Sequence, residues 1–188
     1  MRFYKLLFDE ENSTDDELVA CVEEDFENKY SIHKYSIYKG RKIENWDGEL
    51  TFYFDPSEGD KPTDYLANDL GWPIVSDKIK QILVDLEVKN IQFLEVKIKN
   101  KQTMEQINGF SVVNVTKLIK GLCPEKSLLS KTSFGGVIKP VLKREAVINY
   151  ALFRLEEAPY GLFVSEVVKR EMENQNVTGC YFYEVRTV

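Results

Sequence analysis

The sequence contains few of the side chains on which catalytic and metal sites depend. It has one histidine, His33, and three scattered cysteines, Cys21, Cys123 and Cys180. A histidine-based catalytic triad or a zinc site needs several such residues at defined spacing. We therefore predict no metal, no cofactor and three reduced thiols, mostly in the core. A nucleotide-binding loop is also missing, because Phe134-Gly135-Gly136-Val137 lacks the lysine or third glycine that such loops require.

Long apolar runs are missing as well. No apolar run approaches the roughly 20 residues of a membrane-spanning helix, so we expect no membrane partner. The apolar stretch at the N-terminus is shorter than the core of a signal peptide, and acidic residues follow it at once. With 43% hydrophobic and 30% charged residues, the composition is typical of a soluble globular protein. We expect a cytoplasmic location.

Charge is distributed unevenly along the chain. The net charge is −6, but residues 1–30 carry ten acidic and three basic side chains, whereas residues 97–144 carry ten basic and two acidic ones. Such segregation bears on partners and on association rates rather than on fold. The acidic segment is either the solvated face of a helix or a surface for a basic partner.

A helix is predicted over residues 15–27. Thr14 followed by Glu17 fits a capping box. Apolar residues then recur at every fourth position from Leu18 to Phe26, which is typical of a helical stripe.

Strands are predicted over 2–8 and 50–54, which are rich in apolar, aromatic and β-branched residues. A polar connection over 55–71 contains prolines and glycines that favour turns. We expect one α+β domain over residues 1–188. Within it, the connection could separate an N-terminal subdomain, 1–55, from a C-terminal region, 70–188.

Two stretches of the sequence match at an offset of 89 residues. Trp72–Lys80 corresponds to Gly161–Lys169. Each stretch has an apolar run, a serine suited to cap a helix, and an acid at the first helical position. An alternating strand follows each helix. The sequence therefore predicts a duplicated helix–strand unit, 76–98 and 165–187.

Further strand candidates lie between the two units, at 110–115 and 146–155. A loop-prone zone covers 121–136 and ends in Ser133–Gly136. Many strands with few helices predict an α+β fold with mixed or antiparallel sheets.

An enzyme is one alternative function. Glu95 and Lys97 form an acid-x-lysine pair on a strand, which resembles the pattern of Mg²⁺-dependent nucleases. Alternating charges also occur on any exposed strand face, and Glu184 and Arg186 repeat the pair in the second unit.

A nucleic-acid-binding module is the other alternative. The basic segment 97–144 could neutralise phosphates. However, Phe110 and Phe134 are its only aromatic residues for base stacking, so nucleic acid is the less favoured partner.

Trp46 and Trp72 are the only tryptophans. Large aromatic side chains usually anchor a core, and core anchoring is the favoured interpretation. The alternative is a binding hot spot, in which tryptophan is enriched.

Six segments between about residues 70 and 188 share their order and spacing with one known family. They are Trp72-Pro73-Ile74-Val75-Ser76, Gln92-Phe93-Leu94-Glu95-Val96, Val112-Val113-Asn114-Val115, Ala151-Leu152-Phe153-Arg154-Leu155, Phe163-Val164-Ser165-Glu166-Val167-Val168-Lys169 and Val177-Thr178-Gly179-Cys180-Tyr181-Phe182. In these segments the chain resembles a group of bacterial immunity proteins from polymorphic toxin systems, long filed as a domain of unknown function.

The resemblance implies a non-enzymatic cytoplasmic protein that binds and neutralises a cognate protein toxin. If that toxin is a nuclease with a basic cleft, the acidic segment 9–27 would imitate phosphate and speed association. The hypothetical toxin-binding residues are six acids and one tryptophan: Asp15, Asp16, Glu17, Glu23, Glu24, Asp25 and Trp46.

Overall fold

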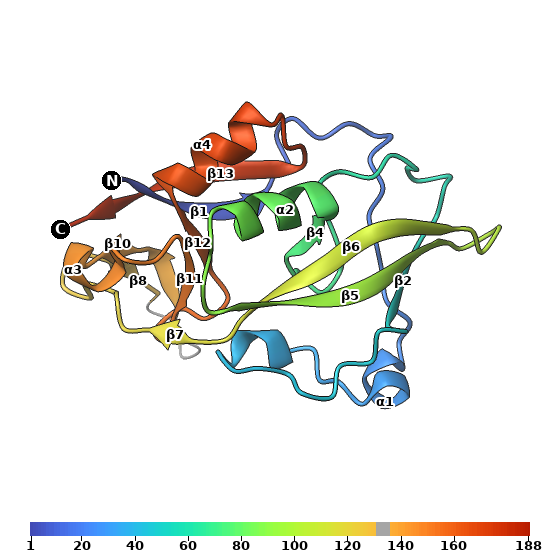
Figure 1. The fold of residues 1–188 in the computed structure, drawn as a ribbon, viewed down its shortest axis with the longest axis horizontal. Coiled ribbons are helices and arrows are strands. Elements are labelled where there is room, and N and C mark those ends of the chain that lie inside the picture. Colours follow the sequence, from blue (N-terminus) through green and yellow to red (C-terminus); the bar gives the residue numbers. More distant parts are fainter. Residues whose placement is uncertain (131–135) are drawn as a thin grey trace.

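The computed structural model describes residues 1–130 and 136–188. These residues form two curled sheets, a two-stranded hairpin and four short α-helices (Figure 1). The predicted α+β class with mixed sheets and few helices is confirmed. Most of the predicted Ser133–Gly136 loop lies outside the described residues.

The first sheet has five strands in the order β2-β5-β6-β4-β3. Only the β2–β5 pair is parallel. Helix α2 (Asp77–Asp85) connects β4 to β5. The strands are β2 (Thr51–Phe54), β3 (Tyr65–Leu66), β4 (Ile74–Ser76), β5 (Ile91–Asn100) and β6 (Gln106–Val115).

The second sheet has six strands in the order β10-β13-β1-β12-β11-β7. Helix α4 (Glu166–Asn174) connects β12 to β13. The strands are β1 (Phe3–Phe8), β7 (Leu118–Ile119), β10 (Val141–Leu142), β11 (Leu152–Leu155), β12 (Leu162–Ser165) and β13 (Cys180–Thr187). The separate hairpin pairs β8 (Leu128–Leu129) with β9 (Val137–Lys139).

The duplication extends well beyond the predicted helix–strand unit. The order β2-β5-β6-β4-β3 in the first sheet corresponds to β10-β13-β1-β12-β11 in the second. Each pair of neighbours also keeps its direction: β2–β5 and β10–β13 are parallel, and the other corresponding pairs are antiparallel. The central strand of the second copy, however, comes from the N-terminus of the chain. Figure 1 shows this strand, β1, beside β13 and β12.

The two copies of the helix also end in the same way. Glu87 and its counterpart Asn176 both have left-handed backbones, with φ of 50° and 52°. The next N–H in each copy, Val88 or Val177, donates to the carbonyl five residues back, at 3.0 and 2.9 Å. This is the Schellman arrangement. The predicted serine caps are wrong in detail, because neither helix has a side-chain cap hydrogen bond and the Ser76 hydroxyl donates to Asp64 instead.

The predicted helix 15–27 is wrong. Residues 17–21 contain isolated bridges to distant residues, turns lie on either side, and only the end of the stretch enters α1 (Phe26–Tyr30). Leu18 and Ala20 are buried while Val19 between them is exposed, so the segment has the period of a strand. Its backbone pairs with distant residues of the chain, which outweighs the local helical pattern. A short 3₁₀ helix, η1 (Ser36–Tyr38), follows.

The strand predicted over 146–155 is correct only at its end. The first part of this stretch belongs to helix α3 (Arg144–Val147), and β11 begins at Leu152. The N–H of Ile148 closes a helical turn on the Arg144 carbonyl at 3.0 Å. Val147 is fully buried, so packing of this turn outweighs the β propensity of the sequence.

Three apolar clusters form the core. One lies between the first sheet and the N-terminal segment and contains the fully buried Trp72. A second contains the buried faces of α2 and α4, and the third contains Phe153 on the other side of the second sheet. The core interpretation is confirmed for Trp72. Of the three free cysteines, Cys123 is buried, Cys180 is half-buried and Cys21 is exposed.

Candidate functional site

The acidic segment is held in place by backbone pairing rather than by a helix. The N–H groups of Leu18 and Ala20 donate to carbonyls of the connection before β4, at 3.0 and 2.9 Å. Cys21 and Tyr53 of β2 exchange two backbone hydrogen bonds, at 2.8 and 2.7 Å. The N–H of Val22 then donates to the carboxylate of Asp69, at 3.2 Å. These bonds make the segment one wall of a groove against β2.

The groove has a cavity volume of about 520 Å³. Three parts of the chain form it: the acidic segment, the end of β2 with the turn after it, and the turn between β5 and β6. It is lined by Val19, Cys21, Val22, Glu23, Glu24, Tyr53, Asp55, Glu58, Lys101 and Met104.

Four carboxylates and one lysine give the groove a net negative charge. Glu23 pairs with Lys29 at 2.5 Å. Asp55 accepts hydrogen bonds from the hydroxyl and the N–H of Ser57, which hold its pKa below the ordinary value. Glu24 and Glu58 are exposed and form no ion pair with any residue that the structure describes. The groove therefore presents uncompensated negative charge.

Large apolar side chains are exposed in the same groove. Val19 is 54% exposed and Met104 is 53% exposed. Met104 lies in the β5–β6 turn with a left-handed backbone, at a φ of 63°. Its N–H donates to the carbonyl of Asn100 at 2.9 Å, and the Asn100 side chain accepts from two further N–H groups of the turn. The turn is thus fixed with Met104 facing the groove.

The remaining predicted acids lie along the same segment, outside the groove. Asp16 pairs with Lys61, and the bonds from Lys61 and Thr14 lower the pKa of Asp16. Burial and the neighbouring Asp16 raise the pKa of Glu17, which lines a second hollow of about 200 Å³. Asp15 and Asp25 are exposed.

Trp46 does not line the groove. It is half-buried against the first core cluster, with its ring centroid 6.2 Å from that of Trp72. Its indole N–H donates to the carbonyl of Glu95 at 2.7 Å. This hydrogen bond satisfies the polar end of the side chain. Trp46 therefore packs on the core and is bonded to β5.

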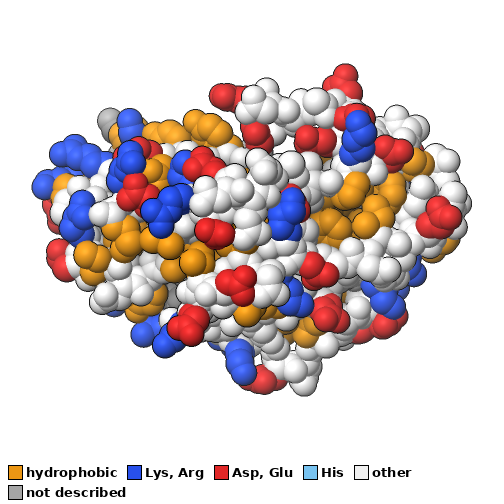
Figure 2. All heavy atoms as spheres, turned by 45° about the horizontal axis from the view of Figure 1, so that its top comes forward, with side chains coloured by type: hydrophobic (Ala, Val, Ile, Leu, Met, Phe, Trp, Pro, Cys, Tyr) orange, Lys and Arg blue, Asp and Glu red, His pale blue; other side chains and the backbone are white. Residues whose placement is uncertain are grey.

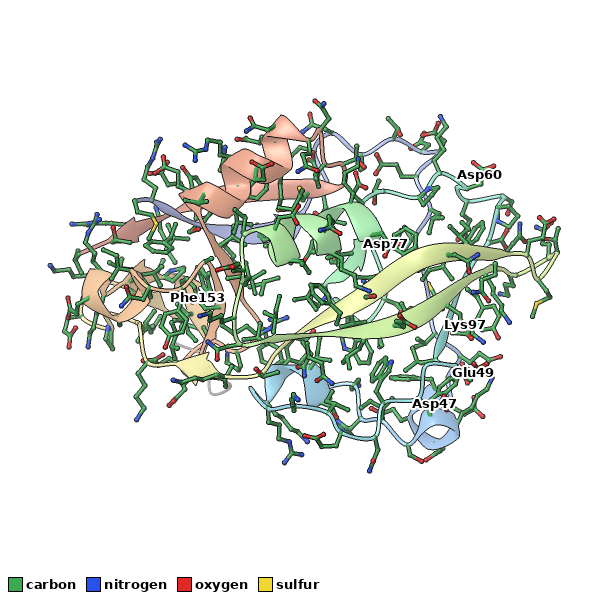
Figure 3. All side chains as sticks on the ribbon, in the orientation of Figure 1. Asp47, Glu49, Asp60, Asp77, Lys97 and Phe153 are labelled. Carbon is green, nitrogen blue, oxygen red and sulfur yellow. The ribbon has the colours of Figure 1, made fainter. Side chains whose placement is uncertain are left out.

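The nuclease-like pair lies in a different hollow. Glu95, Lys97 and Asp77 line a space of about 250 Å³ next to β6. The ammonium group of Lys97 pairs with Glu49, and Figure 3 shows the two side chains at the same end of the molecule. Within residues 1–130 and 136–188, no group of three or more His, Cys, Asp or Glu side chains is arranged to hold a metal ion.

The basic segment 97–144 does not form one surface. It runs from β5 through β6 and β7 to β10, across the length of the molecule (Figure 1). Phe110 is buried, and Phe134 lies outside the described residues. Figure 2 shows Lys and Arg side chains grouped at the left end, with further ones scattered along the lower edge and toward the right.

Sequence reasoning missed half of the groove. Asp55 and Glu58 come from the polar connection, and Met104 from a turn. The three acidic residues between positions 55 and 60 could have indicated from the sequence that this connection belongs to an acidic surface. Nothing in the sequence places Met104 beside Val19, because their proximity depends on long-range pairing.

The fold and this groove define a small α+β protein with a preformed acidic surface. The sequence comparison adds its family. The chain belongs to the Imm11 immunity protein family, whose profile matches residues 2–187. The match is longer than the predicted stretch, about 70–188, and includes the acidic segment. Comparison with curated proteins gave no match. No helix of the described residues is both long and apolar enough to cross a membrane.

Proposed function

We propose that this chain is a non-enzymatic cytoplasmic protein that binds and neutralises a cognate protein toxin. Membership of the immunity protein family supports a toxin partner in general. The observation on which the proposal chiefly rests is the concentration of exposed acids along residues 9–27 and around the groove. Such a surface attracts a basic partner and speeds its association.

The predicted acids should contribute unequally. Asp16 and Glu23 already have lysine partners, Lys61 and Lys29. Their charge is partly compensated before any toxin arrives, and exposed pairs of this kind contribute little to stability. We therefore assign the electrostatic attraction of the toxin mainly to Asp15, Glu24 and Asp25. We expect Glu17 and Trp46 to contribute less to it.

Co-expression with the product of the neighbouring gene, which the proposal expects to be the toxin, tests the function. Rescue of growth, together with co-purification of the two proteins, is the expected result. No rescue by a well-expressed, folded chain would contradict the proposal.

The electrostatic part needs a separate measurement. A triple variant with Asp15→Asn, Glu24→Gln and Asp25→Asn should slow association with the toxin, most clearly at low salt, where charges are least screened. The matched control neutralises three exposed acids elsewhere on the chain: Glu44, Glu145 and Glu157. Equal association rates for the two triple variants at low salt would contradict the assignment to the acidic segment.

A further inference from the structure

We propose that the groove between the acidic segment, β2 and the β5–β6 turn is the toxin-docking site, and that it takes a cationic side chain flanked by an apolar one. This inference rests on the proposed function, since it names the part of the surface that makes the contact and the chemistry of the segment that enters it. The occupant to which we commit is a segment of the toxin in which arginine or lysine neighbours a large apolar residue.

The composition of the groove points to this occupant. Its apolar floor includes Val19 and Met104, both more than half exposed. Glu24 and Glu58 stand at the same groove without ionic partners among the described residues. An arginine or lysine can lay its aliphatic stem on apolar surface while its charged head meets carboxylates. Arginine is also among the residues enriched at binding hot spots.

The groove is already formed in the free chain. Two bonds tie the turn that presents Met104 to the end of β2 and the residue after it: the N–H of Lys101 donates to the Phe54 carbonyl at 2.9 Å, and the Gln102 amide donates to Asp55 at 3.3 Å. The opposite wall is fixed by the Cys21–Tyr53 backbone pair. A preformed site loses less conformational entropy on binding, so contacts made here contribute more fully to affinity.

The backbone of Met104 indicates that its side chain matters for more than folding. A left-handed residue other than glycine is strained, and glycine would fit this position better. A large apolar side chain that is 53% exposed at this position is also unfavourable for solvation. Burial of that side chain against a partner would offset the solvation cost.

Met104→Gly is therefore a sharp test, because it removes the side chain from the groove while relieving the backbone. With the inactivated toxin domain of the neighbouring gene as probe, we expect dissociation to become faster and affinity to fall by about tenfold or more. The thermal unfolding midpoint should stay equal or rise. The control is Glu87→Gly, which makes the same exchange at a left-handed position outside the groove and should leave binding unchanged.

A charge-reversal pair tests the cationic half of the proposal. Glu24→Lys with Glu58→Lys should reduce the association rate by about tenfold or more at low salt and flatten its salt dependence. Glu44→Lys with Glu157→Lys is the matched control, since both residues are exposed and have no ion pair among the described residues. This double variant should bind as the parent protein does.

The outcomes separate this inference from the proposed function. If the parent chain rescues growth and binds the toxin, but the groove variants bind equally well, the docking site lies elsewhere and only this inference fails. If the parent chain neither binds nor rescues, the proposed function fails and the inference with it. If Met104→Gly instead converts a self-associating chain to a monomer without changing toxin binding, the groove joins two copies of this chain, and the inference is overturned.

Discussion

Asp64 joins the two copies of the duplicated unit, and its replacement should weaken the whole fold. Its carboxylate accepts hydrogen bonds from the hydroxyl of Ser76 at 2.7 Å and from the N–H of Thr178 at 3.0 Å. Lys78 pairs with the same carboxylate at 2.8 Å. Ser76 precedes α2 in the first copy, and Thr178 lies between α4 and β13 in the second. The Asp64 side chain therefore links Ser76 to Thr178, and its bond to Thr178 spans 114 positions of the chain.

The stability that Asp64 contributes should depend on pH. Burial alone would raise the pKa of Asp64, but the hydrogen bonds from Lys78, Ser76 and Thr178 outweigh burial, and the net pKa is lowered. A carboxyl with a lower pKa in the folded state stabilises the protein above its unfolded pKa, about 3.9. This contribution is lost as the pH falls through the folded pKa.

The expected magnitude follows from the bonds that Asp64→Asn would weaken. Each hydrogen bond to a charged group contributes about 1.5–3 kcal/mol net. The lysine pair adds at most about 1 kcal/mol, because the Lys78 side chain is 41% exposed. An asparagine keeps one acceptor oxygen but turns an NH₂ group toward the other donors. We expect Asp64→Asn to lower the free energy of unfolding by about 2–4 kcal/mol at pH 7.

Urea unfolding of the parent and variant at pH 7 and at pH 3 measures this effect. The deficit of the variant should shrink at pH 3, which lies below the unfolded pKa of about 3.9, because the unfolded parent chain then takes up a proton that the folded chain binds more weakly. Asp60→Asn is the control, because Asp60 is an exposed acid of the same connection (Figure 3). An equal deficit at both pH values, or a deficit no larger than that of the control, would refute the reasoning.

Two further predictions concern the core and the duplicated helix ends. Phe153 stacks on Phe163 with ring centroids 5.5 Å apart and meets the edge of Phe3 at 5.7 Å. We expect Phe153→Ala to lower the free energy of unfolding by about 3–5 kcal/mol and Phe153→Leu by about 1.5 kcal/mol or less; similar values for both in urea unfolding would contradict this. At the left-handed helix ends, Glu87→Gly should raise the free energy of unfolding by about 1 kcal/mol. Asn176→Gly should gain less, because asparagine tolerates this conformation; a larger gain for Asn176→Gly would contradict the explanation.

The parts of the fold that follow from local pattern were predictable. The residues after Ser76 and Ser165 begin α2 and α4 as expected, because an apolar stripe and an acidic first turn act together there. The prediction over 15–27 failed because Leu18 and Phe26 fit a helical period, while the backbone of this segment bonds to β2 and to the distant connection before β4. Local periodicity gives no information about such partners.

The groove could be predicted only in part, for the same reason. The charge distribution along the sequence identified Glu23 and Glu24, because both lie in the acidic segment. It did not find that Glu58 faces them, or that Met104 lies beside them, since these residues meet only through pairing of β2 with the acidic segment and with β5. The family resemblance, in turn, brought no site residues with it.

The duplication itself gives a reason to place function in the groove. The two copies share their sheets and helices. Packing of the fold explains the residues that form these shared elements, so they are not evidence of a partner. The groove is built where the copies differ. The residues after β2 form an acidic turn at 55–58, whereas their counterparts 144–147 form α3. The β5–β6 turn has no counterpart among the described residues, because the corresponding strands, β13 and β1, are not consecutive in the chain and no turn joins them. A scaffold used twice, with the acidic turn 55–58 and the Met104 turn in the first copy only, is expected if these two turns were selected for binding rather than for folding. Loss of toxin binding in groove variants that keep the stability of the parent chain is the result that this argument requires.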